Sequence, residues 1–348
     1  MLIIGGYTER VNENTPGKAR GISVYDFFPS EGRIQFLGFT PAKNPSYLIT
    51  DRKRSVVYAV LENKQGEGAG VSAHKVNLSK QGKVWFEPFG ELELPGDSPC
   101  HLCFAKNTLL VASYGSNHLH VVQREEDGVL GDIIQTISLT SDKADHQPHA
   151  HCVAYHEERE QVFLCDIGDN KLRVFDRAEG GILTERPELA LNFPENEGPR
   201  HITFHPDGLL AVVNAESIGQ VHLIDLSGEK PLRANRMNYL PERVMEEAAG
   251  AAVRLSTNGK MVYVSDRTFS VITALRIDEK AKNMVLRDTY PSGGEGPRDL
   301  VLSTSGEWLL TANTVDHTVA VFRVDPKGAL THYHTFKKVP SPTCLAWL

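Results

Sequence analysis

A short phrase that recurs seven times limits, more than any other feature, how this chain can fold. The clearest copies are NPSYLIT, SPCHLCF, GPRHITF, GPRDLVL and SPTCLAW, which start at Asn44, Ser98, Gly198, Gly296 and Ser341. Looser copies are HAHCVAY at His149 and a phrase that starts at about residue 249 and contains GAAVRLS from Gly250. Successive phrases start 45 to 54 residues apart, and each is followed by two further apolar or alternating runs. This period is near the roughly 40–50 residues of a four-stranded propeller blade.

The two ends of the sequence complete one another. Only eight residues remain from the start of the last phrase, at Ser341, to the end of the sequence. The segments LIIGGYT at Leu2 and GISVYDF at Gly21 resemble the second and third runs of a repeat. Strands from both ends would therefore build one blade and leave no open edge in the ring. The sequence predicts an all-β protein, a single seven-bladed β-propeller domain over residues 1–348 whose last blade is closed by N- and C-terminal strands.

Charge and hydropathy restrict the partners that we expect. The formal net charge is −7, which disfavours nucleic acid as a partner because no basic domain is present to neutralise phosphates. The start MLIIGGYTER lacks the basic region and the cleavage site of a signal peptide, and no apolar run approaches the roughly 18 residues of a membrane span. We therefore expect a cytoplasmic protein with neither a nucleic-acid nor a membrane partner. Five irregularly spaced cysteines indicate no disulfide framework.

One position of the repeated phrase predicts the functional site. The first strand of a propeller blade lines the central channel, so the third residue of each phrase should face that channel. These residues are Ser46, Cys100, His151, Arg200, Ala251, Arg298 and Thr343. Most are small, and burial of an unpaired charge is costly. The exceptions, His151, Arg200 and Arg298, therefore favour an anionic ligand in the channel.

Two further charged residues follow at a fixed spacing. Glu216 comes sixteen residues after Arg200, and Arg267 comes sixteen residues after Ala251 in the next repeat. The antiparallel return of the second strand brings both positions towards one rim of the channel. Glu216 is expected to pair with Arg200 or Arg298, and Arg267 to add to the positive charge. Taken singly, each of these residues could instead belong to a structural salt bridge between blades.

The segments EGPRHITFHPDG, VVNAES, YVSDRTFSVITALRID, EGPRDLVLSTSGEWLLTAN and SPTCLAWL resemble the seven-bladed propeller lactonases. That family includes a bacterial type of 6-phosphogluconolactonase and the fungal carboxy-cis,cis-muconate lactonising enzyme. The resemblance covers nearly the whole chain. It implies a catalytic set at the channel mouth, which falls on His151, Glu216, Arg200 and Arg298. It departs at Ala252, where relatives often carry an acid.

The resemblance implies hydrolysis of a small anionic lactone that bears a phosphate or a carboxylate. The expected substrate is 6-phospho-D-glucono-1,5-lactone, which gives 6-phosphogluconate in the pentose phosphate pathway. His151 is expected to be the general base, because imidazole titrates near neutral pH, with Glu216 as the alternative base. The two arginines would stabilise the oxyanion and hold the anionic group. The residues expected to contact substrate are His149, Arg267 and His201, and no cofactor is expected.

Three alternatives remain open at this point. The same residues would serve a related lactone or muconolactone cyclase. The fold alone does not determine function, so a non-catalytic propeller that binds a ligand or a protein is also possible, and Ala252 favours it. A zinc site could form from His149, His151 and Glu216, but the nearby arginines would repel a cation. No metal site is therefore predicted.

Overall fold

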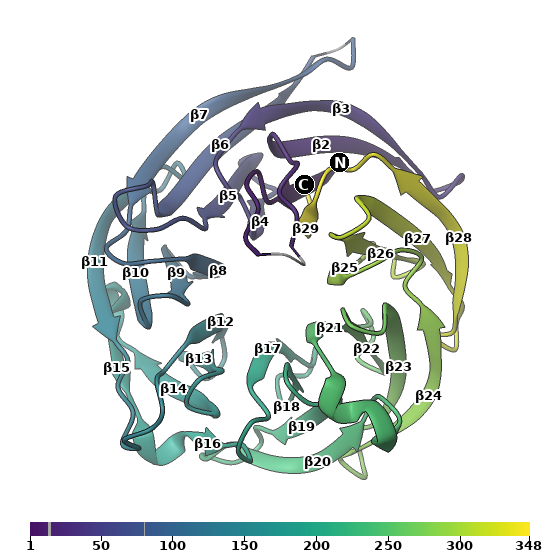
Figure 1. Ribbon diagram of the computed structural model, residues 1–348. Helices are drawn as coiled ribbons and strands as arrows, with labels where there is room; N and C mark the ends of the chain where they lie inside the picture. The colour runs from purple at the N-terminus through teal and green to yellow at the C-terminus, as the bar shows by residue number, and fades with distance from the viewer. Residues whose placement is uncertain (13–14, 80) are drawn as a thin grey trace.

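The computed structural model describes residues 1–12, 15–79 and 81–348. These residues form seven antiparallel sheets arranged in a ring around a central channel (Figure 1). The predicted seven-bladed β-propeller is therefore confirmed. We number the blades 1 to 7, starting at β4.

Each blade consists of four main strands, named here from the channel outwards. The innermost strands are β4 (Leu48–Asp51), β8 (Pro99–Ala105), β12 (Ala150–His156), β17 (Pro199–Phe204), β21 (Gly250–Leu255), β25 (Pro297–Leu302) and β29 (Pro342–Trp347). The second strands are β5 (Val56–Leu61), β9 (Thr108–Ser113), β13 (Gln161–Asp166), β18 (Leu210–Ala215), β22 (Met261–Asp266), β26 (Trp308–Asn313) and β1 (Leu2–Gly6).

The outer half of each blade completes the sheet. The third strands are β6 (Gly70–Leu78), β10 (His118–Arg124), β14 (Lys171–Arg177), β19 (Gln220–Asp225), β23 (Val271–Asp278), β27 (Thr318–Val324) and β2 (Gly21–Phe28). The outermost are β7 (Val84–Glu93), β11 (Leu130–Ser138), β15 (Leu183–Glu185), β20 (Leu232–Asn238), β24 (Asn283–Pro291), β28 (Leu330–Lys337) and β3 (Arg33–Pro41). Short β16 (Leu191–Asn192) also pairs with β14, and the connections hold the 3-10 helices η1 (Glu179–Gly181), η2 (Pro187–Leu189) and η3 (Glu242–Glu247).

The hydrophobic core lies between the blades. The second strands of blades 1 to 6 are buried along their whole length, because a neighbouring blade covers each face of the sheet. The outermost strands, such as β20, are largely exposed or half-buried. Among the described residues, buried apolar side chains form seven clusters, one at each junction of adjacent blades. Each blade thus depends on both of its neighbours for burial of its faces.

The seventh blade joins the two ends of the chain. Strand β1 pairs with β29 in antiparallel register, with Ile3 opposite Ala346, and then continues to β2 and β3. The N-terminal ammonium group of Met1 donates a hydrogen bond to the carbonyl oxygen of Leu348 at 3.1 Å. The predicted closure by N- and C-terminal strands is therefore present, and purple and yellow ribbons meet in this blade in Figure 1.

Three blades have a glycine in the turn between their first and second strands. Gly208, Gly259 and Gly306 end matching turns with φ of 71°, 73° and 74°, a backbone region that favours glycine. The five cysteines are free thiols. Within the described ranges, no helix has the length and apolar character needed to cross a membrane.

Candidate active site

The predicted channel-facing slot lines a small polar cavity at the centre of the ring. Six of its seven residues border the cavity, namely Ser46, Cys100, His151, Arg200, Arg298 and Thr343. Glu62 and His201 also contribute to its wall. Its volume of about 20 Å³ is enough for a single water-sized molecule. The repeat alignment thus brings the three predicted channel residues to one place.

His151, on β12, is a buried and uncharged imidazole. Burial, followed by the charge of Arg200, holds the pKa of His151 well below its ordinary value of 6.5. Its Nδ1 atom is buried and has no hydrogen-bond partner among the residues that the structure describes. The ring lies 5.3 Å from that of His201, measured between centroids. His151 can therefore accept a hydrogen bond at neutral pH, but a positive charge on it would be strongly disfavoured.

Arg200, on β17, is almost completely buried, with a side-chain exposure of 3%. Its Nη1 atom donates hydrogen bonds to the carbonyl oxygen of Ala251 at 2.8 Å and to Nε2 of His201 at 3.0 Å. Burial lowers the pKa of Arg200 to about 10, so the group remains charged at neutral pH. These contacts make Arg200 a fixed positive charge in the cavity wall.

Glu216, directly after β18, joins two arginines at the channel rim. It forms an ion pair with Arg267, directly after β22, and its Oε2 atom lies 3.5 Å from Nε of Arg200. Burial alone would raise the pKa of Glu216, but the charges of Arg267 and Arg200 lower it below its ordinary value. The predicted pairing of Glu216 with Arg200 is present. Arg267 is its closer partner, and no ion pair joins Glu216 to Arg298 among the described residues.

Sequence reasoning missed a second acid at the cavity. Glu62 follows β5 directly and accepts a hydrogen bond from the hydroxyl of Tyr7 at 2.9 Å. Nη2 of Arg298 donates to the same hydroxyl at 2.9 Å, and its guanidinium lies over the Tyr7 ring. Burial raises the pKa of Glu62 above its ordinary value, although Arg298 opposes this shift. Glu62 comes sixteen residues after Ser46, the spacing that identified Glu216, so the repeat contained the signal.

The other two predicted contact residues differ in position. His201 lines the cavity and is buried, and burial followed by Arg200 holds its pKa well below 6.5. His149 precedes β12 instead of lying within it, and it borders neither this cavity nor the cleft described below. Its ring stacks on that of Tyr114 at 4.5 Å, and Nδ1 lies 3.0 Å from the Tyr114 carbonyl oxygen. The expected contact of His149 with substrate is therefore not supported by its position.

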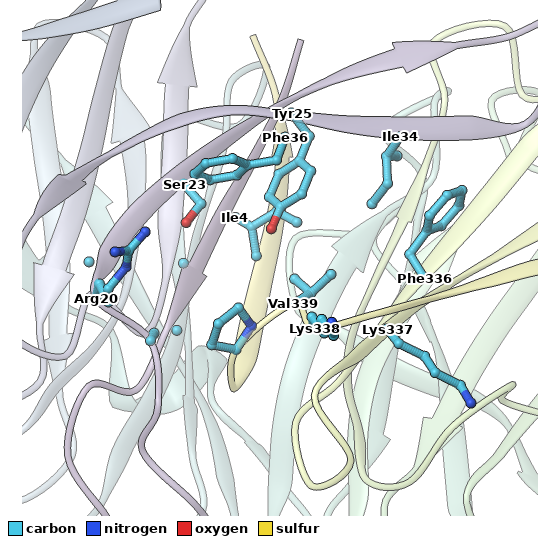
Figure 2. Close-up of a pocket in the computed structure, with 15 residues that line it drawn as sticks. Ile4, Arg20, Ser23, Tyr25, Ile34, Phe36, Phe336, Lys337, Lys338 and Val339 are labelled. Carbon is cyan, nitrogen blue, oxygen red and sulfur yellow. The ribbon is translucent and has the colours of Figure 1, made fainter.

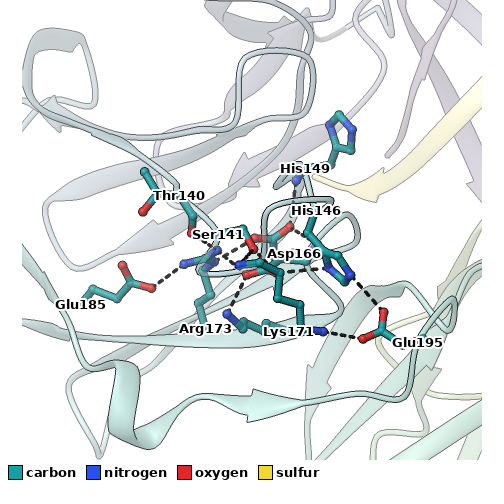
Figure 3. A network of polar contacts seen from close by, with 11 residues as sticks. Thr140, Ser141, His146, His149, Asp166, Lys171, Arg173, Glu185 and Glu195 are labelled. Atoms are coloured by element: carbon teal, nitrogen blue, oxygen red, sulfur yellow. Dashed lines mark hydrogen bonds and ion pairs between the residues drawn. The ribbon is translucent and has the colours of Figure 1, made fainter.

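A buried charge network fixes the start of β12. The Oδ1 atom of Asp166 accepts a hydrogen bond from the backbone N–H of His149 at 2.8 Å, and its Oδ2 atom accepts one from Nε of Arg173 at 2.8 Å. Arg173 also contacts Asp169 and Glu185. Figure 3 shows this network, with the His149 ring turned away from it. The network holds the backbone two residues before His151.

Ala252, which stands where relatives often carry an acid, lies between two blades. Ala252 is fully buried in the apolar cluster between blades 5 and 6, whereas Ala251 occupies the channel slot of the repeat. The equivalent position borders the cavity in other blades, where His201 and Asp299 occupy it. Ala252, which stands in place of the acid seen in relatives, packs against the next blade and is not among the residues that line the cavity.

The three residues considered for zinc are His149, His151 and Glu216, and they are not among the side chains whose ligand atoms lie close together. Within residues 1–12, 15–79 and 81–348, one group of three His, Cys, Asp or Glu side chains has ligand atoms within 4.8 Å of one another. That group is His205, Asp207 and Glu279. His205 and Asp207 lie in the turn between β17 and β18, at the opposite end of β18 from Glu216.

A wide cleft opens beside the small cavity. Its volume is about 1080 Å³, and its wall includes Lys18, Arg267, Arg298 and His317. Arg298 borders both spaces and thus stands between the cleft and the cavity. A ligand in the cleft could reach Arg298, and through it the water-sized space that Glu62 and His151 line.

A second hollow, of about 400 Å³, lies between the outer parts of blades 6 and 7 (Figure 2). Tyr25, Ile34, Phe36 and Phe336 give it a mainly apolar wall. It has basic residues at its edge, such as Arg20, but no carboxylate or histidine in its wall. This hollow therefore lacks the acid and base groups that hydrolysis needs.

Comparison with known proteins agrees with the fold and identifies the family. The family described as "Lactonase, 7-bladed beta-propeller" matches residues 1–347. The 6-phosphogluconolactonase of Bacillus subtilis is 27% identical over 316 residues, which cover 88% of this chain and 87% of that protein. An uncharacterized protein of Staphylococcus aureus is 26% identical over 337 residues, covering 92% of this chain and 91% of that one.

Solved structures share the architecture. The periplasmic gluconolactonase of Pseudomonas aeruginosa superposes with a TM-score of 0.87 at 23% identity, covering 99% of this chain and 97% of that one. A protein from Lactobacillus plantarum superposes with a TM-score of 0.84 at 20% identity, covering 99% and 98%. At this level of identity the likeness supports the propeller fold alone.

Proposed function

The chain belongs to the lactonase family of seven-bladed β-propellers, and from that premise we propose that it hydrolyses 6-phospho-D-glucono-1,5-lactone to 6-phosphogluconate. The observation that carries the proposal is the position of Arg298. This cation separates an open cleft from a water-sized cavity that holds a carboxylate, Glu62, and a neutral imidazole, His151. Substrate in the cleft and a water in the cavity would meet at Arg298.

Glu62 is the general base that the electrostatics favour. Proton transfer to His151 would create a cation beside Arg200, which burial and charge already oppose. Proton transfer to Glu62 creates no new positive charge, and the negative charge passes from the carboxylate to the lactone oxygen. The raised pKa of Glu62 makes it a stronger base than Glu216, whose pKa is lowered. His151 then orients the water as a neutral hydrogen-bond acceptor.

The reaction follows in two steps. Glu62 takes a proton from the water while the water oxygen bonds to the lactone carbonyl carbon, and Arg298 stabilises the oxyanion that forms. The bond between that carbon and the ring oxygen then breaks, and the ring oxygen receives the proton from Glu62. The product is the open-chain acid, which ionises to the carboxylate. Arg200 and Arg267 hold Glu216 at the rim and contribute positive potential.

Initial-rate measurements test this proposal. We expect the wild-type protein, treated with a chelator, to open 6-phosphogluconolactone faster than the spontaneous reaction. Glu62→Gln should lower kcat by about 10²–10⁴-fold, the usual contribution of a general base. Glu67→Gln, an exposed residue on the same connection, is the matched control and should retain full rate. A wild-type rate equal to the spontaneous rate would exclude the function, and full activity of Glu62→Gln would exclude the assigned base.

A further inference from the structure

The cleft contains a second group of polar side chains that the proposed hydrolysis does not use. Lys18 and His317 line it, together with Arg267 and Arg298. Glu295 is the one carboxylate of its wall among the described residues, and it is exposed. Even with Arg267 paired to Glu216, the cations of this wall outnumber the carboxylates, although the whole chain has a formal net charge of −7. A local excess of cations in an acidic protein is suited to an anionic ligand.

Ser341 fixes Lys18 and His317 beside one another, although they lie far apart in the sequence. The backbone N–H of Lys18 donates a hydrogen bond to Oγ of Ser341 at 3.0 Å. The backbone N–H of Ser341 donates to Nδ1 of His317 at 3.1 Å. Ser341 itself is completely buried. Three distant segments of the chain thus meet at one buried serine, which holds the backbone of Lys18 and the ring of His317.

The same contact determines what His317 offers to a ligand. Because Nδ1 accepts the hydrogen bond from Ser341, the neutral ring carries its proton on Nε2, where it is a donor. Burial, followed by the charge of Lys18, lowers the pKa of His317, so this neutral form predominates at neutral pH. The outer part of the cleft therefore combines an ammonium group with an imidazole N–H donor. Phosphate oxygens accept hydrogen bonds from both groups.

We propose that Lys18 and His317 form a subsite that binds the phosphate group of the substrate while Arg298 binds the lactone carbonyl. This inference rests on the proposed lactonase function. It assigns the phosphate to residues outside the repeated slot, since Arg200 is buried and already donates to Ala251 and His201. The cleft, at about 1080 Å³, is large enough for a phosphorylated sugar.

Binding of the two open-chain products tests the subsite without requiring turnover. Isothermal titration calorimetry would compare 6-phosphogluconate with gluconate, which lacks the phosphate. Lys18→Ala should weaken binding of 6-phosphogluconate roughly tenfold to thirtyfold, because a charge-assisted hydrogen bond is lost. His317→Asn keeps a residue that tolerates the φ of 61° and should weaken binding about threefold to tenfold. Lys337→Ala removes an exposed lysine from β28 and serves as the control.

The inference requires that Lys18→Ala weaken binding of the phosphorylated product specifically. It is overturned if Lys18→Ala weakens both products equally, if it binds 6-phosphogluconate as tightly as the control does, or if the wild-type protein binds neither product. Kinetics then separate this inference from the proposed function. In an active enzyme, Lys18→Ala should raise KM for the phosphorylated lactone with little change in kcat. Binding that depends on Lys18, without any acceleration of lactone opening, would refute the hydrolytic function and leave the subsite intact.

Discussion

Replacement of Glu216 by glutamine would remove the charge that neutralises Arg200. The side chain of Arg200 is 3% exposed, and that of Glu216 is 26% exposed. Nε of Arg200 lies 3.5 Å from Oε2 of Glu216, and at an effective dielectric of about 20 the Coulomb attraction between these two charges is about 5 kcal/mol. Partial exposure of Glu216 reduces this, whereas the unscreened repulsion between Arg200 and Arg267 adds to the cost of the substitution. We expect a loss of about 3 kcal/mol in the free energy of unfolding, at the lower end for a broken buried pair.

Denaturation experiments measure this loss. At roughly 2.1 cal/mol/K per residue, unfolding of a chain of this length has an entropy of about 0.7 kcal/mol/K, so 3 kcal/mol corresponds to a decrease of about 4 °C in Tm. Urea unfolding at neutral pH should give a lower midpoint with an unchanged slope. Glu160→Gln, which alters an exposed ion pair with Lys106, is the matched control and should leave the midpoint unchanged.

The pH dependence provides a second measurement. The pKa of Glu216 is lowered in the folded state, so its contribution to stability is present above the unfolded value of about 4.3 and is lost as the pH falls through the folded value. The difference between wild type and Glu216→Gln should therefore shrink in acid. The reasoning is refuted if Glu216→Gln is as stable as Glu160→Gln at neutral pH.

Four further results are expected. Tyr7→Phe removes the hydroxyl that contacts Glu62 and should lower kcat/KM about tenfold, equivalent to ~1.4 kcal/mol, in the lactone assay. In wild-type pH–rate profiles, kcat/KM should fall as the pH decreases through the pKa of Glu62, which lies above 4.5, because the base must be ionised. If kcat/KM of Tyr7→Phe and Glu62→Gln falls at the same acidic pH as in the wild type, this expectation is contradicted. Asp166→Asn weakens the bond from Arg173 and should lower the free energy of unfolding by about 1–3 kcal/mol in urea titrations; wild-type stability would contradict the role of the network. Deletion of Pro342–Trp347 removes β29 and should abolish the cooperative thermal transition in circular dichroism, and a normal transition would show that closure is dispensable.

The repeated strands explain how much of the fold and the site could be predicted from the sequence. A strand that recurs in each blade places equivalent residues at equivalent positions, so alignment of the phrases located His151, Arg200 and Arg298 at one cavity. The same sixteen-residue spacing separates Ser46 from Glu62 in the first blade, so the repeat also indicates this acid. The repeat does not indicate that Ala252 packs between two blades, because its equivalents His201 and Asp299 border the cavity.

Residues on connections could not be predicted in this way. Lys18 lies on a connection outside the strands, for which the repeated phrases offer no equivalent position. His317 ends the turn before the third strand of its blade, at the place that Asn170 and Ser270 hold in other blades. The proximity of Lys18 and His317 depends on hydrogen bonds to Ser341, which is distant from both in the sequence. The stacking of His149 on Tyr114 is likewise a contact between two connections. The contacts of Lys18 and of His149 follow from tertiary structure, whereas the bond from Ser341 to His317 has counterparts at Asn170 and Ser270 in other blades.

The pairing of β1 with β29 also sets an order of events during synthesis. Residues Leu2–Gly6 leave the ribosome more than 300 residues before their partners in Pro342–Trp347. At about 5–20 residues per second, this delay is on the order of 20–70 s. During that interval β1 has an unpaired edge, and the faces of blades 1 and 6 that later pack against blade 7 are uncovered. The nascent ring thus depends on rapid completion, or on a chaperone, to avoid association through these surfaces.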